Sequence, residues 1–539
     1  MNPRFKADQS EQKLRGGYYT PNAYAEYVAK WVLEKNPQHI LEPSCGDGAF
    51  VRASEKYLKD KKTAITCFEL MQAEAEKVIE LGAELDLPSL NVQCQDFIEY
   101  ANKLIKNNDR AFDAIVGNPP FIRYQFIEPV FQEKAEECFK LLGQKFTKLT
   151  NSWVVFIFAC IALLKEGGRL GMVIPSEILH VLHAKELRKY IMENSSTVMV
   201  INPKELWFKG TSQGTVMLLL EKKKNQTLDC GLGLLNVQDD SFLAQSIEDL
   251  FADVPFSNDE GKWTEAMLTK EEKSLYENLK QNTAVKRFGE LAKPSVAITS
   301  GANEFFLVND ETIKEFGLAK YAHPIFSNSR HCKGLIYDEN LHEKNKQDGE
   351  PVNYVLIDDH ELSGDVWEYI ELGELSRYHE RYKCKIRSPW FKAPNVVGQD
   401  GCINKFSHEC PKLVVNRISA YTTDGFYRVQ VRDNISIEKM STCFLNPFTM
   451  LCAELEGRFY GGGVLELTPS EITKICIPYG IDLEVNLEHL NQLIQTDGLV
   501  NVVYNHGRKV LSKLGVQDDQ YELIFDAWIK LKNVRQRKD

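Results

Sequence analysis

The tetrapeptide Asn118-Pro119-Pro120-Phe121 has residue types that suit chemistry on a planar, weakly nucleophilic nitrogen. The lone pair of such a nitrogen is delocalised, so a site must hold the amine with hydrogen-bond acceptors that favour a pyramidal geometry. The Asn118 side-chain oxygen and the Pro119 carbonyl could be these acceptors, and consecutive prolines stiffen the turn. Phe121 could stack on the ring that carries the amine. A rigid proline turn without catalytic function is the alternative.

A glycine-rich segment at residues 42–48 follows a short apolar run and precedes a helical pattern. Gly46 and Gly48 would let the backbone approach a ligand closely. Their spacing differs from the GxGxxG of dinucleotide sites, and the carboxylates of Glu42 and Asp47 would repel a pyrophosphate but attract a sulfonium cation. The segment, which includes Ser44, therefore predicts an S-adenosylmethionine site. A turn that binds no ligand is the alternative.

Two acidic residues end the next two apolar runs. Glu69, which precedes Leu70, follows the glycine-rich segment by about 20 residues, where a carboxylate can accept both ribose hydroxyls. Asp96 ends the third run, where it could accept from an adenine amine while Phe97 packs on the ring. Either acid alone is more simply a solvated carboxylate. The order of the three features at successive strand ends favours a cofactor site.

Strands must position these residues, and the sequence pattern of the first 220 residues predicts such strands. Short β-type runs alternate with segments of helical spacing, which is typical of βαβ units around a mostly parallel sheet. Ligands of such sheets bind at the carboxyl ends of the strands, where the motifs above lie. The predicted runs are 39–41, 64–68, 91–94, 112–116, 169–174 and 215–220.

The composition, with 539 residues, 43% hydrophobic and 26% charged, is that of a globular protein with two or three cores. The thirteen cysteines form no CxxC pair, and apolar surroundings at Cys67, Cys94 and Cys160 indicate reduced core thiols. The apolar run 153–164 is shorter than the roughly 20 residues of a membrane span and predicts a buried helix, and the polar first residues predict no signal peptide. We expect a monomer of the prokaryotic cytoplasm, without a metal site or membrane contact.

The net charge of −11 argues against a protein that coats nucleic acid with its whole surface, but residues 373–434 carry +5 while the remainder carries −16. This basic window mixes cations with aromatic residues such as Tyr378, Tyr382 and Phe391, which suits phosphate contacts and wedging between bases. A solvated basic face is the alternative. The predicted DNA contacts are Arg377, Arg381, Lys383, Lys385, Arg387, Trp390 and Lys392.

In this order the motifs resemble the gamma class of DNA adenine-N6 methyltransferases, the TaqI-like group of restriction-modification type systems. The resemblance is strongest over residues 14–220 and begins at Gly17-Tyr18-Tyr19-Thr20-Pro21. It implies that S-adenosylmethionine is bound by Thr20 together with the loop glutamate and the two strand-end acids. The full set of predicted cofactor contacts is Thr20, Glu42, Ser44, Gly46, Asp47, Gly48, Glu69, Leu70, Asp96, Phe97, Asn118 and Pro120.

The same resemblance implies how a target base is held. Asn118, Pro119 and Pro120 would bind the adenine amine, and Phe121 and Phe208 would bracket an adenine flipped out of duplex DNA, with Trp207 as an alternative to Phe208. In the C-terminal half, residues 300–306 and 460–469 look like recurring pieces of TaqI-like recognition domains. Ser300 stands where threonine is more usual.

We therefore predict an α/β fold with four parts. A Rossmann-like methyltransferase domain with a mostly parallel sheet occupies residues 1–255, and a connector occupies 256–285. A mixed α+β target-recognition domain follows at 286–482, and a helical segment at 483–539. The mixed polar stretch from 225 to about 282 is interpreted as covering helices and the connector.

Other functions stay open. Methylation of adenine in RNA is one, and methylation of protein glutamine, whose enzymes use a similar motif but are shorter, is another. Cytosine-N4 methylation usually goes with serine or aspartate at position 118. A catalytically inactive DNA-binding specificity protein is the alternative outside enzymes, and intact Asn118 argues against it. Neither flank contains a convincing nuclease pattern, so the expected partners are duplex DNA and a separately encoded restriction endonuclease.

Overall fold

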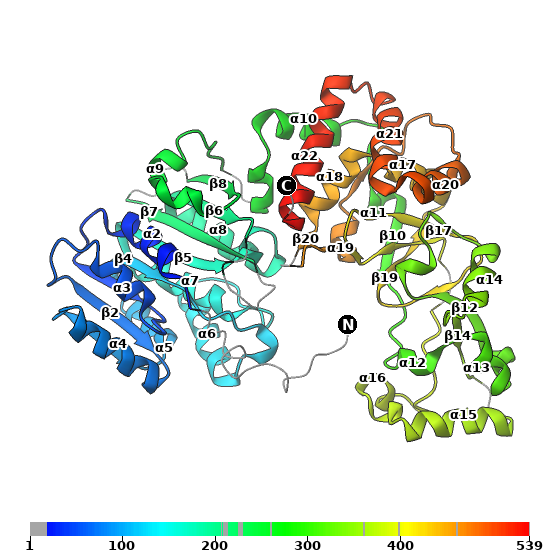
Figure 1. Cartoon of the computed structure of the whole chain (residues 1–539), viewed down its shortest axis with the longest axis horizontal. Helices are drawn as coiled ribbons and strands as arrows, with labels where there is room; N and C mark the ends of the chain where they lie inside the picture. Colours follow the sequence, from blue (N-terminus) through cyan, green and yellow to red (C-terminus); the bar gives the residue numbers. More distant parts are fainter. Residues whose placement is uncertain are drawn as a thin grey trace. The chain divides into compact units, whose positions relative to one another are not determined.

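The computed structural model describes residues 19–205, 207, 214–224, 230–258, 261–358, 362–396, 399–459 and 462–537. The chain divides into two compact units, and Figure 1 labels many of their helices and strands. The first comprises Met1–Thr269 with Tyr460–Gly462 and Arg537–Asp539, and the second comprises Lys270–Phe459 and Gly463–Gln536. The chain passes from the first unit to the second at residue 270, inside the stretch predicted as a connector.

An eight-stranded sheet with the order β3-β2-β1-β4-β5-β7-β6-β8 forms the centre of the first unit. Strands β1 to β5 pair in parallel, β7 runs antiparallel to β5 and β6, and β8 runs parallel to β6. The predicted Rossmann-like, mostly parallel sheet is thereby confirmed. The strands are β1 (His39–Glu42), β2 (Ala64–Glu69), β3 (Leu90–Cys94), β4 (Phe112–Gly117), β5 (Leu164–Pro175), β6 (Ser195–Pro203), β7 (Thr215–Lys222) and β8 (Gly231–Val237).

The predicted runs did not include β6 and β8, and β8 lies in the stretch that we interpreted as helices and connector. Glycines interrupt the β-type pattern of β8 and weaken its signal in the sequence. They are there because Phe256 covers the strand closely: a Cβ at Gly233 would lie 2.9 Å from the Phe256 ring, and one at Gly231 would lie 3.1 Å from the Phe256 side chain. The close packing of Phe256 thus explains why β8 contains glycines in place of residues with high β-propensity.

Eight α-helices accompany this sheet among the described residues. The helix α7 is apolar on nearly all sides and is buried along its length, as the run 153–164 predicted. The search for a helix long and apolar enough to cross a membrane found none among the described residues. The helices are α2 (Asn22–Leu33), α3 (Ala49–Glu55), α4 (Gln72–Glu84), α5 (Phe97–Lys106), α6 (Pro129–Leu141), α7 (Ser152–Leu163), α8 (Lys185–Asn194) and α9 (Ile247–Leu250).

The second unit combines small sheets with a group of helices. Its largest sheet has the order β10-β19-β15-β17-β13, and the next has the order β11-β14-β12-β18. These strands are β10 (Ala292–Val296), β11 (Leu307–Val308), β12 (Ala322–Phe326), β13 (Ile336–Tyr337), β14 (Asn353–Val355), β15 (Gly401–Asn404), β17 (Leu413–Asn416), β18 (Tyr421–Thr422) and β19 (Phe426–Val431). The smaller sheets pair β9 (Lys286–Arg287) with β22 (Cys476–Ile477), and β21 (Leu465–Glu466) with both β16 (Phe406–Ser407) and β20 (Arg458–Phe459).

Helices of the second unit surround these sheets and end the chain. The predicted helical C-terminal segment is confirmed as α20 (Leu487–Asp497), α21 (Leu499–Ser512) and α22 (Asp518–Gln536). The others are α10 (Lys270–Lys280), α11 (Phe288–Leu291), α12 (Asn303–Phe306), α13 (Asp310–Glu315), α14 (Glu339–Gln347), α15 (Gly364–Leu375), α16 (Tyr382–Lys385), α17 (Ile437–Phe444), α18 (Pro447–Glu456) and α19 (Pro469–Ile472).

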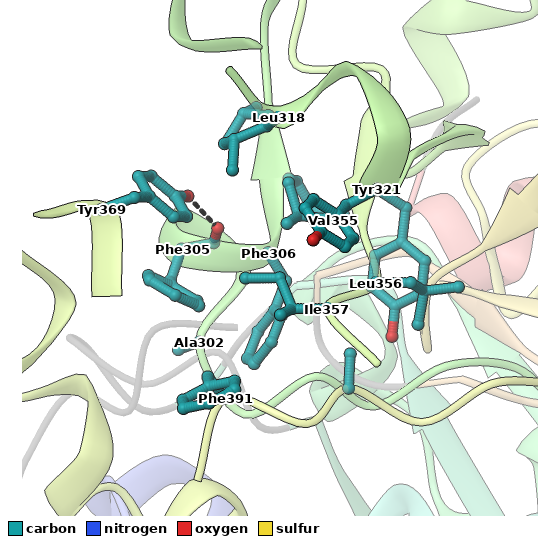
Figure 2. Packing of buried hydrophobic residues seen from close by; sticks show 14 of the residues in the cluster. Ala302, Phe305, Phe306, Leu318, Tyr321, Val355, Leu356, Ile357, Tyr369 and Phe391 are labelled. Atoms are coloured by element: carbon teal, nitrogen blue, oxygen red, sulfur yellow. Dashed lines mark hydrogen bonds between the residues drawn. The ribbon is translucent and has the colours of Figure 1, made fainter. Parts of the chain in front are cut away.

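An aromatic cluster forms one core of the second unit (Figure 2). Phe305 of α12 stacks on Tyr369 of α15 with ring centroids 4.7 Å apart, and the Tyr369 hydroxyl donates a hydrogen bond to the Phe305 carbonyl. Trp390 lies 4.8 Å from the same phenylalanine ring. The segment 300–306 and the basic window therefore pack on a common core.

All thirteen cysteines are free thiols. Cys67 and Cys160 are buried, as their surroundings predicted, but Cys94 is exposed. The prediction for Cys94 was wrong because β3 is the edge strand of the sheet, so its last residue is not covered by a neighbouring strand.

Candidate active site

The strand order of the large sheet reverses at β1, which pairs with β2 on one side and with β4 on the other. In open α/β sheets ligands bind in the crevice beyond the carboxyl ends of the strands at such a reversal. The segment 42–48 leaves β1 there, and Asn118 leaves β4. The Ser44 hydroxyl donates to the Asn118 carbonyl at 3.0 Å, which joins the two loops. The glycine-rich segment and the proline tetrapeptide thus form one site.

Both glycines of the segment 42–48 have left-handed backbone conformations, with φ of +49° at Gly46 and +78° at Gly48. Gly48 precedes α3, and a Cβ on it would lie 2.7 Å from the Leu81 side chain of α4. A Cβ on Gly46 would lie 3.1 Å from the Tyr19 ring. The tight turn at the switch point therefore requires glycine at both positions.

Glu69 connects the turn after β1 to the turn after β2. Its Oε2 accepts a hydrogen bond from the Gly46 amide at 3.1 Å, while its Oε1 accepts from the amides of Leu70 at 2.8 Å and Met71 at 3.0 Å. The Leu70 side chain is exposed. Glu69 therefore stands at the predicted strand end with its carboxylate directed into the same crevice as Gly46.

Glu42 is 2% exposed, and no lysine or arginine is among the groups that shift its pKa within the described residues. Burial, followed by the nearby Cys45 and Asp47, raises the pKa of Glu42 well above its usual range, and the Cys67 thiol donates to its Oε2 at 3.9 Å. Burial also raises the pKa of Asp47. A bound cation would favour the charged form of both groups, so this pair fits the sulfonium and amino groups of S-adenosylmethionine.

Asp96 already has several partners within the protein. It caps α5 by accepting from the amides of Ile98 at 2.8 Å and Glu99 at 3.3 Å, and its other oxygen accepts from Lys134 of α6 at 3.0 Å. The Phe97 ring is buried against Phe68 and Phe156. Sequence reasoning located Asp96 at its strand end but did not anticipate the bond from Lys134, which lies 38 residues away along the chain.

The N-terminal motif reaches the tetrapeptide through Thr20. The Asn118 amide nitrogen donates to the Thr20 hydroxyl at 3.1 Å, and Thr20 is buried just before α2 begins. In this arrangement the amide nitrogen faces Thr20, and the amide oxygen lies at the opposite end of the group. Of the aromatic candidates, the Phe121 ring is buried. The structure thus brings Thr20, Ser44 and Asn118 together.

Phe208, the predicted second stacking residue, lies outside the described residues, as do Gly17 and Tyr18. Trp207 is described, and its ring stacks on Tyr24 of α2 at 4.4 Å. The Tyr24 hydroxyl donates to Asp240 at 2.7 Å. In this structure Trp207 is therefore a buried packing residue.

Sequence reasoning missed two polar residues at the start of α7, Asn151 and Ser152. The Ser152 hydroxyl donates to the Pro120 carbonyl and accepts from the Ile122 amide at 2.9 Å. The Asn151 side-chain oxygen accepts from the Tyr124 amide at 3.0 Å. The signal was present, since an Asn-Ser pair directly before an apolar run is typical of a helix start, but the sequence alone does not reveal what such a pair contacts.

Behind Asn151 lies a buried carboxyl. The Asn151 amide nitrogen donates to Glu177 Oε2 at 3.1 Å and lies 3.4 Å from His183 Nε2. Glu177 follows β5, and burial raises its pKa, while Arg123 and the bond from Asn151 lower it. The pKa of Glu177 remains above its usual value on balance.

The predicted DNA contacts of the second unit fall into two groups. Arg387 donates to the carbonyls of Ser300 at 2.6 Å and Thr299 at 2.9 Å, and Trp390 donates to Glu374 at 3.0 Å. These two residues hold the protein's own backbone and side chains. Gly301 explains the tight packing here, because its φ is +89° and a Cβ on it would lie 2.6 Å from the Cβ of Lys383.

The remaining predicted contacts are exposed. Arg381 pairs with Glu304 at 2.7 Å and Arg377 pairs with Glu380 at 2.7 Å, both at the surface. Three of the predicted DNA contacts are lysines that form no ion pair with any described residue: Lys383, Lys385 and Lys392.

Other cations of the basic window are used inside the fold. Lys412 is buried and donates to the carbonyls of three successive residues, Cys332, Lys333 and Gly334. Arg417 pairs with Glu438 and Glu488, each at 2.7 Å. The charge of +5 in the window therefore overstates the charge that it presents to a partner.

Comparisons with known proteins find one matching family model in each half of the chain. The family model described as N-6 DNA Methylase matches residues 5–243, and the model described as Type II methyltransferase M.Eco57I, C-terminal domain, matches residues 260–511. The boundary between the two matches lies close to the division of the structure at residue 270. Both matches agree with the resemblance drawn from the order of the motifs.

Curated relatives extend the similarity over the whole chain. The Type II methyltransferase M.AccI of Acinetobacter calcoaceticus is 23% identical over 94% of this chain and 93% of that protein. M.HindII of Haemophilus influenzae is 23% identical over 58% of each protein. Among solved structures, a DrdV–DNA complex is 12% identical, covering 83% of this chain and 54% of that chain with a TM-score of 0.47.

Proposed function

We propose that this chain acts as a DNA methyltransferase of the adenine-N6 class found in restriction-modification systems, and that it transfers methyl from S-adenosylmethionine to the N6 amine of an adenine flipped out of duplex DNA. The observation that carries the proposal is the junction at the switch point. Asn118 is held there by Ser44 of the glycine-rich segment and by Thr20 of the N-terminal motif. Cofactor and amine would therefore meet at one residue.

The cofactor would lie along the ends of β1, β2 and β3. Glu42 and Asp47 would face its cationic groups, Glu69 would accept the ribose hydroxyls, and Asp96 would accept from its adenine amine while keeping Lys134. When bound, S-adenosylmethionine supplies an electrophilic methyl group and a neutral thioether as the leaving group. The protein's part is alignment, because no covalent intermediate with a side chain is required. The other predicted contacts follow β1, β2, β3 or β4, and they are Ser44, Gly46, Gly48, Leu70, Phe97 and Pro120.

The target amine would be held by the Asn118 side-chain oxygen and the Pro119 carbonyl. The bond from the Asn118 amide nitrogen to Thr20 supports this orientation, since it uses the donor end of the side chain. Accepting both amine hydrogens favours a pyramidal nitrogen with a localised lone pair that could attack the methyl group, and one of these hydrogens would leave the amine as a proton. Phe121 would stack on the flipped base, with Phe208 as the predicted opposite face.

The second unit would recognise the DNA site. Its exposed lysines Lys383, Lys385 and Lys392 are suited to phosphate contacts, whereas Arg387 and Trp390 are engaged within the unit. Methylation at a specific site would protect host DNA in the cytoplasm from a separately encoded restriction endonuclease. The two relatives described above, M.AccI and M.HindII, are named as Type II methyltransferases.

The proposal is tested by following labelled methyl groups from S-adenosylmethionine into duplex DNA, RNA and protein. We expect label in duplex DNA that is recovered as N6-methyladenine after digestion. Asn118→Ala should abolish transfer while binding of S-adenosylmethionine persists. Label recovered only in RNA adenine or in protein glutamine would overturn the DNA assignment, and equal transfer by Asn118→Ala would overturn the site.

A further inference from the structure

We propose that Asn151, Ser152 and Glu177 form a loop latch that fixes the catalytic segment 118–124 in its reactive shape and makes these three side chains positioning residues for methyl transfer. The inference rests on the proposed function for its kinetic consequence, but its structural content stands on the contacts of the first unit alone. None of the three residues was predicted from the sequence motifs.

Ser152 binds the segment directly after the prolines. Its hydroxyl donates to the Pro120 carbonyl and accepts from the Ile122 amide at 2.9 Å, and its own amide donates to the Ile122 carbonyl at 3.0 Å. Ser152 is fully buried. One residue therefore provides partners for three backbone groups on either side of Phe121, and losing these partners would cost free energy.

Asn151 binds the segment two residues further on. Its side-chain oxygen accepts from the Tyr124 amide at 3.0 Å. Asn151 stands at the position that caps α7, yet its side chain makes no capping bond to that helix. An asparagine at this position ordinarily satisfies the first helical amides, so its use on the segment instead is a departure that favours loop positioning over helix stability.

Glu177 orients Asn151. Its Oε2 accepts from the Asn151 amide nitrogen at 3.1 Å, so the amide oxygen must face Tyr124. Glu177 is buried, which raises its pKa and makes the carboxyl expensive to retain for stability alone. The chain Glu177, Asn151, Tyr124 therefore runs from the end of β5 to the catalytic segment.

The kinetic consequence concerns alignment. The carbonyl of Pro119 and the side chain of Asn118 lie on the stretch that the latch and Ser44 hold at both ends. A displacement of about 1 Å in such a stretch costs on the order of 100-fold in rate. Loss of the latch should lower kcat while affinities for cofactor and DNA change little.

The first test compares Ser152→Ala with Ser195→Ala. Ser195 is an equally buried serine of the same unit whose hydroxyl has no hydrogen-bond partner in the described residues. Ser152→Ala should lower kcat by about 10- to 100-fold with less than about threefold change in the Kd of S-adenosylmethionine. Ser195→Ala should match the wild type. Equal kcat for Ser152→Ala and Ser195→Ala would overturn the latch.

The second test exchanges donor and acceptor in the buried pair. Asn151→Asp places two carboxyls against each other and should lower kcat, whereas Glu177→Gln keeps an acceptor oxygen and should have a small effect. The double variant Asn151→Asp with Glu177→Gln restores one donor and one acceptor, so it should recover most of the lost kcat. If the decrease in kcat of the double variant equals the product of the decreases in the two single variants, the orienting role of Glu177 is contradicted.

A third measurement separates the latch from the proposed function. Hydrogen exchange at the amides of Ile122 and Tyr124 should be slow in the wild type, and Ser152→Ala should speed exchange at Ile122 by at least tenfold. This result needs no substrate. If the wild type methylated no adenine but these amides behaved as expected, the proposed function would fall and the latch would stand; unchanged exchange would sink the latch whatever the substrate.

Discussion

The burial of Glu42 is the feature of the site that the stability of the fold does not explain. A carboxyl buried without a basic partner lowers stability at neutral pH, because its charged form is poorly solvated. Such a group is retained where a ligand supplies the missing charge. The glycine-rich segment therefore has two separate tasks: Gly46 and Gly48 shape the turn, and Glu42 provides a buried carboxyl that a bound cation would ionise.

The first prediction follows from the raised pKa of Glu42. The folded protein retains a proton that the unfolded chain releases, so the contribution of Glu42 to stability is full below its unfolded pKa and is lost as pH rises through its raised folded pKa. A cationic cofactor favours the ionised form. Binding of S-adenosylmethionine should therefore release protons within that pH window, measurable by calorimetry in buffers of different ionisation enthalpy.

Glu42→Gln provides the control for this proton release. It cannot ionise, so it should bind S-adenosylmethionine more weakly and without the proton release assigned to position 42. Its stability should also fall less steeply with pH in that window. Identical proton release by the wild type and Glu42→Gln would show that another group titrates on binding.

The second prediction concerns the turn at Gly48, with Gly143 as its match. Both have left-handed backbones, with φ of +78° and +67°, but a Cβ on Gly48 meets Leu81 at 2.7 Å while one on Gly143 meets nothing within 4 Å. Alanine at either position should cost about 1–2 kcal/mol for the backbone. Gly48→Ala should lose about 1–3 kcal/mol more through overpacking. Denaturant unfolding measures both, and equal losses would contradict the packing argument.

The residues of the site differ in how far the sequence could predict them. Thr20, Ser44, Glu69 and Asn118 lie at strand ends or in a recurring motif. The structure joins Thr20, Ser44 and Asn118 by hydrogen bonds, and Glu69 accepts from the Gly46 amide of the glycine-rich segment. Ser152 contacts Pro120 from 32 residues away, and that proximity depends on how α7 packs. Pattern and spacing carry no information about such a contact.

At the scale of elements, the large sheet was predictable where strands are apolar and bounded by turns. The predicted runs correspond to β1, β2, β3, β4, β5 and β7, although β5 begins earlier, at Leu164. β6 opens with polar residues and β8 alternates glycine with leucine, so neither shows a strong β-type pattern. Their place in the sheet is decided by neighbours such as β7 and Phe256, which a single sequence does not display.

The third prediction distinguishes a cation near α16 that stabilises the fold from one that we expect to contact DNA. Arg387→Ala removes two bonds to the carbonyls of Thr299 and Ser300 and should destabilise the second unit by about 1.5–3 kcal/mol. Lys385→Ala should leave stability unchanged, weaken DNA binding and reduce the slope of log affinity against log salt by about 1. Thermal unfolding and binding titrations at several salt concentrations measure these effects. Reversed roles for the two variants would contradict the assignment of Arg387 as internal.

At the scale of the molecule, the sheet and the candidate site are complete before the second unit begins. All eight strands lie between His39 and Val237, and every contact described for the site lies within the first unit. The two family matches also change between residues 243 and 260. The large sheet and the candidate site therefore belong to the first half of the chain, and the second half matches a separate family model.

The fourth prediction is that a fragment of residues 1–269 binds S-adenosylmethionine but does not methylate DNA at a specific site. The fragment keeps the entire sheet and loses the bond at 2.9 Å from Arg537 to the Lys204 carbonyl, so its melting temperature should be slightly lower than that of the first unit in the full chain. Calorimetry with S-adenosylmethionine and sequencing of modified bases test both parts. Site-specific methylation by the fragment would show that recognition does not need the second unit.

The loop latch also determines at which stage the catalytic segment 118–124 loses its conformational entropy. A segment held by Thr20, Ser44, Ser152 and Asn151 is ordered once, when the protein folds, and need not be ordered again at each turnover. The remaining movement then belongs to the DNA, where opening one base pair costs a few kcal/mol. Under the proposed function, an adenine opposite a mismatched base should thus be methylated faster than the same adenine opposite thymine. The free energy of opening one base pair would then determine the rate of methyl transfer.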